Sequence, residues 1–273
     1  MKQPVLASLS SVLYLVAAAL IAYRLFMRDR AALPPRSVAL GAAFAGLLLH
    51  TWLLYQTILS PAGLNLAFFN ALSLASWTVI ASLLVPSINK PVENLGIVLL
   101  PVAALTILLD AFYPHVGFMG DAASLQLKLH VLLSMLAYSL LTLASVQAIL
   151  LAVQDHYLHK RQPGGFIRSL PPLMTMEALL FEMIAVGFML LTLALLSGVA
   201  FLDNLFDQHL VHKTVLSVFA WTIFGGLLLG RKLWGWRGRK AIAWTLSGFV
   251  ILLLAYFGSK MVLELILHRT TGA

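Results

Sequence analysis

The class of fold is decided by residues 178–202, ALLFEMIAVGFMLLTLALLSGVAFL, a stretch of 25 residues with one charged side chain, Glu182. About 20 apolar residues in an α-helix are enough to cross the roughly 30 Å hydrocarbon core of a bilayer. A helix also satisfies its backbone hydrogen bonds within the segment, as a lipid environment requires. The stretch therefore predicts a transmembrane helix.

Similar apolar runs recur along the whole chain. Of its 273 residues, 61% are hydrophobic and 10% are charged, and the mean hydropathy is +0.94, whereas soluble domains carry about 25% charged residues. We expect an all-α fold, a polytopic membrane helix bundle that forms one integral membrane domain over residues 1–273. About eight transmembrane helices are predicted, at residues 4–26, 37–59, 64–85, 95–112, 125–153, 178–202, 211–229 and 241–267.

The basic residues predict the orientation of the bundle. Cytoplasmic loops carry an excess of Lys and Arg, and alternate loops of this chain hold 13 of its 18 basic residues: Arg24, Arg28, Arg30, Arg36, Lys90, Lys160, Arg161, Arg168, Arg231, Lys232, Arg237, Arg239 and Lys240. These loops are expected in the cytoplasm, which places both termini on the outer side. Orientation explains the net charge of +8, so we expect no nucleic-acid partner.

The sequence also excludes several kinds of chemistry. The chain has no cysteine, which excludes disulfides, Cys-ligated zinc, iron–sulfur clusters and covalent haem attachment to this chain. It contains no phosphate-binding Gly-rich loop, no Gly-x-Gly-x-x-Gly after a strand and no His-Glu-x-x-His. We therefore expect neither ATP-driven transport by this chain alone nor catalysis by it.

Histidine is the residue type that points to chemistry. Of eight histidines, six fall in the outer half of the predicted bundle: His50, His115, His130, His209, His212 and His268. His130, His212 and His268 lie near the outer ends of three predicted helices, where neutral imidazoles can bind haem iron, copper or zinc. Interfacial hydrogen bonding is the alternative for each. A mononuclear zinc site has little support without cysteine or a compact His/carboxylate motif.

Other polar residues have candidate roles beside these histidines. Lys128 and Lys213 flank His130 and His212 and can face an anionic cofactor group. His50 lies deeper and can either contribute to a cofactor site or hydrogen-bond a neighbouring helix. Other polar and aromatic residues are interpreted as structural. Lys260 and Glu264 are spaced to pair within a helix, and Glu177 suits a helix N-terminus. Trp234 and Trp236 are typical of an aromatic belt.

Several segments, which follow the family's order along the chain, resemble the cytochrome c assembly family of membrane proteins. They are HVLLSMLAY at 130–138, the helix 65–77 that ends in Ser76-Trp77, GFMLLT at 187–192 followed by Ser197-Gly198, GWRGRKA at 235–241, and Gly248-Phe249 with Tyr256-Phe257-Gly258. The resemblance is to the CcsA/HemX-like group, and especially to its short bacterial YpjD-type members. It covers about residues 65–268 and implies a multi-pass protein of the bacterial inner membrane, with its outer side in the periplasm.

The resemblance also implies a cofactor. In that family two outer-face histidines flank a Trp-rich outer segment and bind haem, here haem b, as axial ligands. His130 matches the first of these by position and His268 resembles the second. The Trp-rich segment is replaced here by FLDNLFDQHLVHKT at 201–214, in which His212 is an alternative ligand. Implied partners are other cytochrome c assembly or tetrapyrrole-pathway proteins.

Three functions remain open from the sequence. The leading one is a haem-handling protein that holds haem near the outer leaflet between the predicted helices beginning at 125, 211 and 241. The second is an ion or small-molecule transport component, because His50, Lys260 and Glu264 place polarity inside spans. The third is a regulatory or assembly factor without haem, whose cytoplasmic loop at about 154–175 docks a soluble partner.

Overall fold

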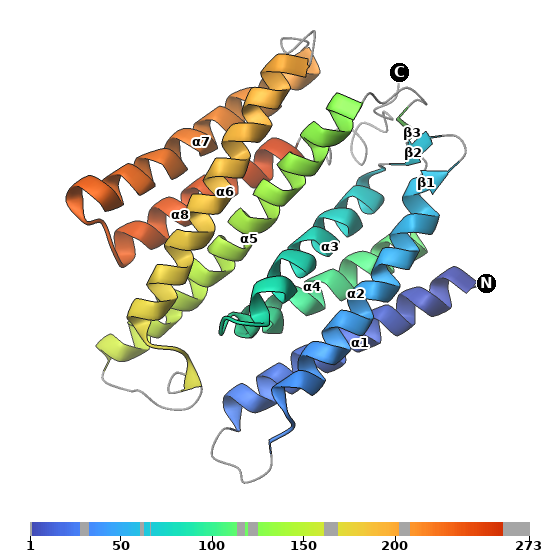
Figure 1. Cartoon of the computed structure of the whole chain (residues 1–273), viewed down its shortest axis with the longest axis horizontal. Coiled ribbons are helices and arrows are strands. Elements are labelled where there is room, and N and C mark those ends of the chain that lie inside the picture. The colour runs from blue at the N-terminus through green and yellow to red at the C-terminus, as the bar shows by residue number, and fades with distance from the viewer. Residues whose placement is uncertain are drawn as a thin grey trace. The chain divides into compact units, whose positions relative to one another are not determined.

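The computed structural model describes residues 2–27, 33–60, 63–65, 67–113, 118–119, 125–160, 169–201 and 208–258. Within these ranges eight helices are long and apolar enough to cross a membrane, which confirms the predicted all-α class and the number of spans (Figure 1). The main helices are α1 Lys2–Phe26, α2 Arg36–Ile58, α3 Phe68–Ser87, α4 Gly96–Phe112, α5 Leu125–His159, α6 Leu173–Phe201, α7 Gln208–Trp234 and α8 Arg239–Leu253.

Three very short strands accompany the helices and were not predicted. They are β1 Leu59–Ser60, β2 Gly63–Asn65 and β3 Phe118–Met119, in the order β1-β2-β3 with antiparallel pairing. Leu64 pairs with Leu59 on one side and with Met119 on the other. Segments of two or three residues are too short to show the alternation by which a strand is recognised in a sequence.

Helix ends differ from the predicted ends where proline or glycine sets them. α6 begins at Leu173 rather than 178, because Pro171 and Pro172 precede it and proline is tolerated at the start of a helix. α7 continues past 229 to Trp234 and ends at Gly235. This glycine has φ +64°, and its N–H donates to Arg231 O over 3.1 Å, as in a left-handed helix cap.

The last predicted span, 241–267, is only partly described. α8 is followed by a π-helical turn at Leu254–Gly258, and residues 259–267 lie outside the described part of the chain. Contact clustering divides the chain into two compact units, one containing α1–α4 with the strands and one containing α5–α8. The single domain, like the placement of both termini outside, stays a prediction.

In the first unit, α1 packs against α2 and α4, and α3 packs against α2 and α4. Small side chains at the contacts let the helix backbones approach one another: Ala17, Ala43, Ala71 and Ala103 are buried. Serines on α1 add hydrogen bonds between helices, from Ser10 Oγ to Gly46 O over 2.9 Å and from Ser11 Oγ to Ala104 O over 3.1 Å.

In the second unit, α5 packs against α6 and α8, and α7 packs against α6 and α8. Glycines allow close approach: a Cβ on Gly187 would lie 2.9 Å from the Leu141 side chain, and one on Gly248 would lie 2.9 Å from Phe224. Figure 1 shows that the start of α5, the end of α6 and the start of α7 lie at the same end of this unit. This arrangement brings His130 to the end of α6.

Candidate functional site

His130 lies near the beginning of α5 and contacts the end of α6. Its Nδ1 is 2.9 Å from Ser197 Oγ, and the same hydroxyl donates to Ala194 O over 2.8 Å. A serine hydroxyl has one proton, so with that proton on Ala194 O, Ser197 accepts its second hydrogen bond from Nδ1–H of His130. For a neutral imidazole, this network corresponds to the tautomer in which Nε2 carries the lone pair that can bind a metal.

Gly198 lets the His130 ring lie against α6. A Cβ at this glycine would be 3.1 Å from His130 Cε1, closer than an ordinary contact, so a larger residue would push the ring away. Ser197 and Gly198 are both buried, whereas His130 is half-buried. Together the hydrogen bond and the close packing fix both the rotation and the position of the imidazole, as the supporting residues of a metal-binding histidine do.

The other predicted site residues are described to different extents. Lys128 is exposed on α5 and Lys213 is half-buried on α7, both near the helix ends that lie beside His130. His212 belongs to the second turn of α7, but its side chain is outside the described part of the structure. The same holds for the side chain of His209 and for His115, Lys260, Glu264 and His268. Which histidine faces His130 therefore stays a prediction.

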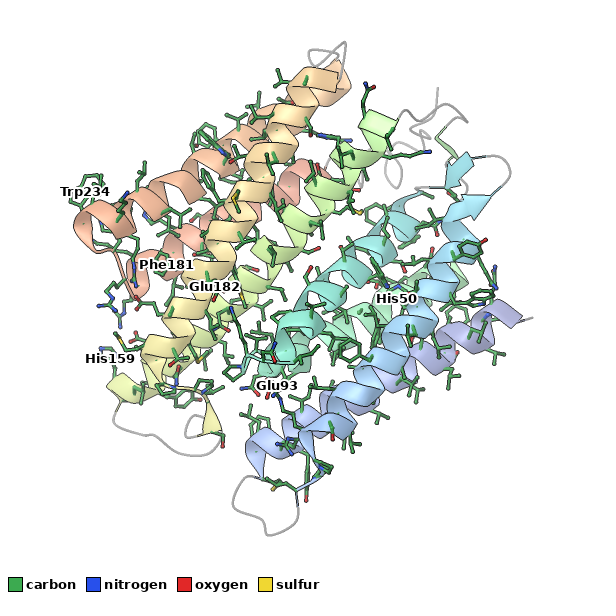
Figure 2. All side chains as sticks on the ribbon, in the orientation of Figure 1. His50, Glu93, His159, Phe181, Glu182 and Trp234 are labelled. Carbon is green, nitrogen blue, oxygen red and sulfur yellow. The ribbon has the colours of Figure 1, made fainter. Side chains whose placement is uncertain are left out.

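His50 belongs to the first unit and is fully buried. From α2 it faces α3 (Figure 2), where its Nε2 is 3.0 Å from Ser73 Oγ. Its Nδ1 is 3.3 Å from the hydroxyl of Tyr14 on α1, whose ring fits against Gly46. Both ring nitrogens thus have partners, which favours the hydrogen-bonding interpretation of His50. Its place among the cofactor-binding residues stays a prediction.

A His50→Leu variant separates the two roles of this residue. We expect it to lower the free energy of unfolding by about 1–3 kcal/mol, because the hydroxyls of Tyr14 and Ser73 lose their shared partner in the interior. We expect haem absorbance per folded molecule to stay unchanged. Unfolding in detergent and visible spectra of the same sample measure both quantities, with Tyr14→Phe as a milder control. Loss of haem absorbance from folded His50→Leu would make His50 a cofactor residue.

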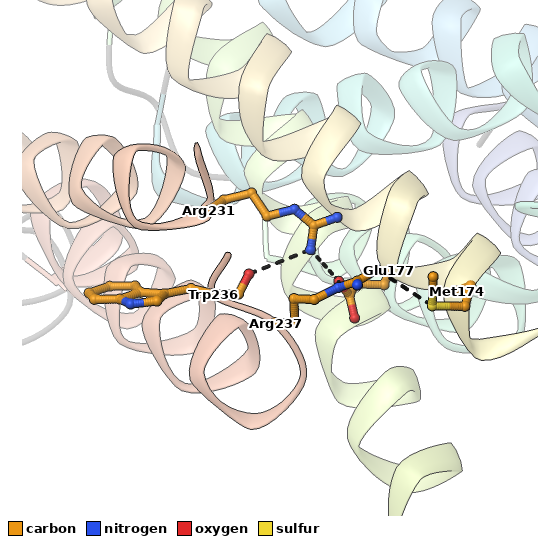
Figure 3. A network of polar contacts seen from close by, with 5 residues as sticks. All are labelled: Met174, Glu177, Arg231, Trp236 and Arg237. Carbon is orange, nitrogen blue, oxygen red and sulfur yellow. Dashed lines mark hydrogen bonds and ion pairs between the residues drawn. The ribbon is translucent and has the colours of Figure 1, made fainter. Parts of the chain in front are cut away.

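At its opposite end the second unit contains an ion-paired cluster that the sequence did not reveal (Figure 3). The Glu177 side chain is 5% exposed and accepts hydrogen bonds from Arg231 and, over 3.0 Å, from Nε of Arg237. Arg231 also lies over the Phe181 ring, with Cζ 4.3 Å from the ring centroid. Glu177 therefore links the turn between α7 and α8 to α6 through two ion pairs. It also lies near the N-terminus of α6, as the sequence predicted.

Taken together, these features define a class: a polytopic helical membrane protein with an oriented histidine at one end of a four-helix unit. Within the described ranges, no three His, Cys, Asp or Glu side chains come together as a metal-binding group. The chain belongs to the family described as Cytochrome C assembly protein, whose model matches residues 39–267. This confirms the family resemblance.

Individual relatives agree with this membership. Inner membrane protein YpjD of Escherichia coli (strain K12) is 34% identical over 275 aligned positions, which cover 96% of this chain and 99% of the relative. Cytochrome c biogenesis protein CcsA of Prochlorococcus marinus (strain MIT 9215) is 26% identical over 200 positions, or 64% of this chain and 62% of the relative. No solved structure matches the chain. The protein is thus a multi-pass protein of the bacterial inner membrane.

Proposed function

We propose that this protein handles haem in cytochrome c biogenesis or haem trafficking, and that it holds haem b near the outer leaflet between two histidines. His130 is one axial ligand in this proposal, and His212 or His268 is the other. The observation that carries it is the orientation of His130, because the hydrogen bond from Nδ1 to Ser197 leaves Nε2 as the ligand atom. The CcsA relatives, named for cytochrome c biogenesis, support the same function.

The residues described at this end of the second unit fit haem. A neutral imidazole whose other nitrogen is hydrogen-bonded is a well-suited axial ligand. Lys128 and Lys213 place positive charge near the same helix ends and can attract the two propionates. Haem bound there would supply a redox-active iron with both axial positions filled. Such ligation favours storage, transfer or electron transfer over oxygen activation.

The proposal concerns holding haem rather than attaching it to a cytochrome. Residues 201–214 lack the Trp-rich segment of the haem-delivering family members, and the chain contributes no thiol of its own. Within the proposal, Ser197 fixes the imidazole tautomer and Gly198 gives the ring its position. Partner proteins of the assembly or tetrapyrrole pathways would supply or receive the cofactor.

Visible spectroscopy tests the proposed function. The protein is purified in mild detergent, and oxidised and reduced spectra are recorded with and without added haem. A six-coordinate haem spectrum with a Soret band is the expected result. A monodisperse protein that stays colourless after haem addition would overturn the proposal and favour the transport or regulatory alternatives.

Removing the hydroxyl that orients His130 is expected to weaken haem binding. A Ser197→Ala variant should bind haem about 10–100-fold more weakly, because loss of an outer-shell partner typically costs a metal site that much. Haem titration followed at the Soret band measures the affinity. Ser145→Ala is the matched control, because Ser145 is also buried and donates to a carbonyl three residues earlier, Thr142 O. Equal affinities of the two variants would contradict an orienting role for Ser197.

A further inference from the structure

The segment 231–240, which joins α7 to α8, carries five basic residues. Two of them form ion pairs with a buried carboxylate. Arg231 and Arg237 both bind Glu177, and Nη2 of Arg237 also lies 3.5 Å from Met174 Sδ. Figure 3 shows these contacts converging on the start of α6. They hold the turn in place. Its other bases, Lys232, Arg239 and Lys240, are exposed, and Lys240 Nζ lies 5.8 Å from the centroid of the Trp236 ring.

These three bases and Trp234 are exposed residues at one turn of the chain, and together we call them the turn patch. Lys232 and Lys240 are exposed, and the Arg239 side chain is 81% exposed. Arg239 Nε is 3.7 Å from an Asp155 carboxylate oxygen, a separation at the limit of an ion pair. Within the described part of the chain, the carboxylates that form ion pairs with these five bases are Glu177 and Asp155, which leaves an excess of three positive charges.

The aromatic part of the turn patch lies where a bilayer has its headgroups. The spans of α7 and α8 run to Trp234 and from Arg239 respectively, so the residues between them lie at the membrane surface. The Trp234 ring stacks on Trp236 at 5.7 Å, and Trp236 contacts Trp244 at 4.9 Å. Trp234 remains 68% exposed and points outward from the end of α7 (Figure 2), as tryptophans at membrane interfaces do.

Apolar residues continue from the turn patch along α7. Leu229 and Leu233 are four residues apart, so they share one helix face, and they are 57% and 64% exposed. This surface is apolar towards the hydrocarbon and basic towards the water. A molecule with a negative head and apolar chains matches it in both parts.

We propose that the turn patch binds an anionic phospholipid, with the phosphate near Lys232, Arg239 and Lys240 and an acyl chain along Leu229 and Leu233. An anionic lipid is favoured over a zwitterionic one because the bases of the turn outnumber the carboxylates that the structure pairs with them, Glu177 and Asp155. Topology accounts for basic residues in this loop, but it does not require them to be exposed around a tryptophan stack. The proposal goes beyond haem handling and is independent of it.

Native mass spectrometry of the full-length protein in detergent tests the proposal. The protein is titrated with phosphatidylglycerol or with phosphatidylcholine of the same acyl chains, and bound lipid is counted. Each base near an anionic surface contributes about a fivefold preference. We therefore expect a preference for phosphatidylglycerol on the order of 100-fold, and its loss in a Lys232→Gln/Arg239→Gln/Lys240→Gln variant.

Two further variants and one competitor make the result decisive. The triple variant Arg28→Gln/Arg30→Gln/Lys160→Gln removes the same charge from other predicted cytoplasmic loops and should keep the preference. A Lys232→Arg/Lys240→Arg variant, which keeps the charge, should keep it too. Equal retention of both lipids by the unaltered protein, or an equal loss in the control triple variant, would overturn the proposal. So would complete displacement of phosphatidylglycerol by inorganic phosphate, which would show a site for free anions.

Discussion

Replacing His130 with alanine is expected to abolish the six-coordinate haem spectrum that the proposed function predicts for this protein. In the proposed function the variant removes a ligand of the haem iron, whereas loss of an outer-shell partner alone costs a metal site about 10–100-fold in affinity. We therefore expect haem affinity to fall by more than about 100-fold. Soret-band titration and reduced-minus-oxidised spectra of the purified variant measure this loss, and size-exclusion chromatography shows whether the variant is folded.

The matched control for this variant is His159→Ala. His159 is on the same helix as His130, at its other end, and it is exposed. Its variant should keep the haem spectrum. Comparing His212→Ala with His268→Ala then identifies the second ligand, because only the variant that removes it should lose six-coordination. Added imidazole should restore absorbance to His130→Ala by occupying the vacated position. An unchanged spectrum in folded His130→Ala would exclude His130 as a ligand.

Replacing Glu177 with glutamine is expected to give the largest loss of stability among single polar substitutions in the second unit. Its buried carboxylate holds two guanidinium groups, and removing one partner of a buried ion pair typically costs about 3–5 kcal/mol. The side chains of Arg231 and Arg237 are 31% and 50% exposed, so water can compensate part of the loss. We expect the free energy of unfolding to fall by about 2 kcal/mol.

Denaturant unfolding in detergent, followed by tryptophan fluorescence, measures the effect of Glu177→Gln. Trp236 is in the turn that Glu177 binds, and its ring contacts Trp244 on α8, so the emission of both reports on release of the turn. Glu182→Gln is the control, since it removes the same charge from an exposed position on the same helix. A Glu177→Gln/Arg237→Gln double variant should be destabilised by less than the sum of its single variants. Additive losses would show that the ion pair contributes no stability.

The bundle itself was predictable because the property that makes it is local. Each span needs only enough consecutive apolar residues to cross the hydrocarbon, and it satisfies its own backbone. The stretch 178–202 met that condition by itself, and so did seven others. The ends were less predictable: at α6 and α7 they are set by Pro172 and Gly235 rather than by where hydropathy falls.

The histidines of the candidate site could be proposed from the sequence, but the residues that contact them could not. Histidine near the end of an apolar run is unusual enough to make His130, His212 and His268 candidates from the sequence alone. Ser197 is one of several serines and threonines in the helices, and nothing local distinguishes the one that meets His130 across 67 residues of sequence. The pair Ser197-Gly198 was visible in the sequence as part of the family pattern. That both residues contact His130 was not visible.

By itself, the sequence determined the membrane class, the eight helices and the family of this protein. Tertiary structure alone decided that Ser197 orients His130, that His50 bridges Tyr14 and Ser73, and that Glu177 binds Arg231 and Arg237. The physical reason is that helix formation in a membrane depends on residues within the segment. Pairing between helices depends on their rotation and depth, which are fixed only when the whole unit packs.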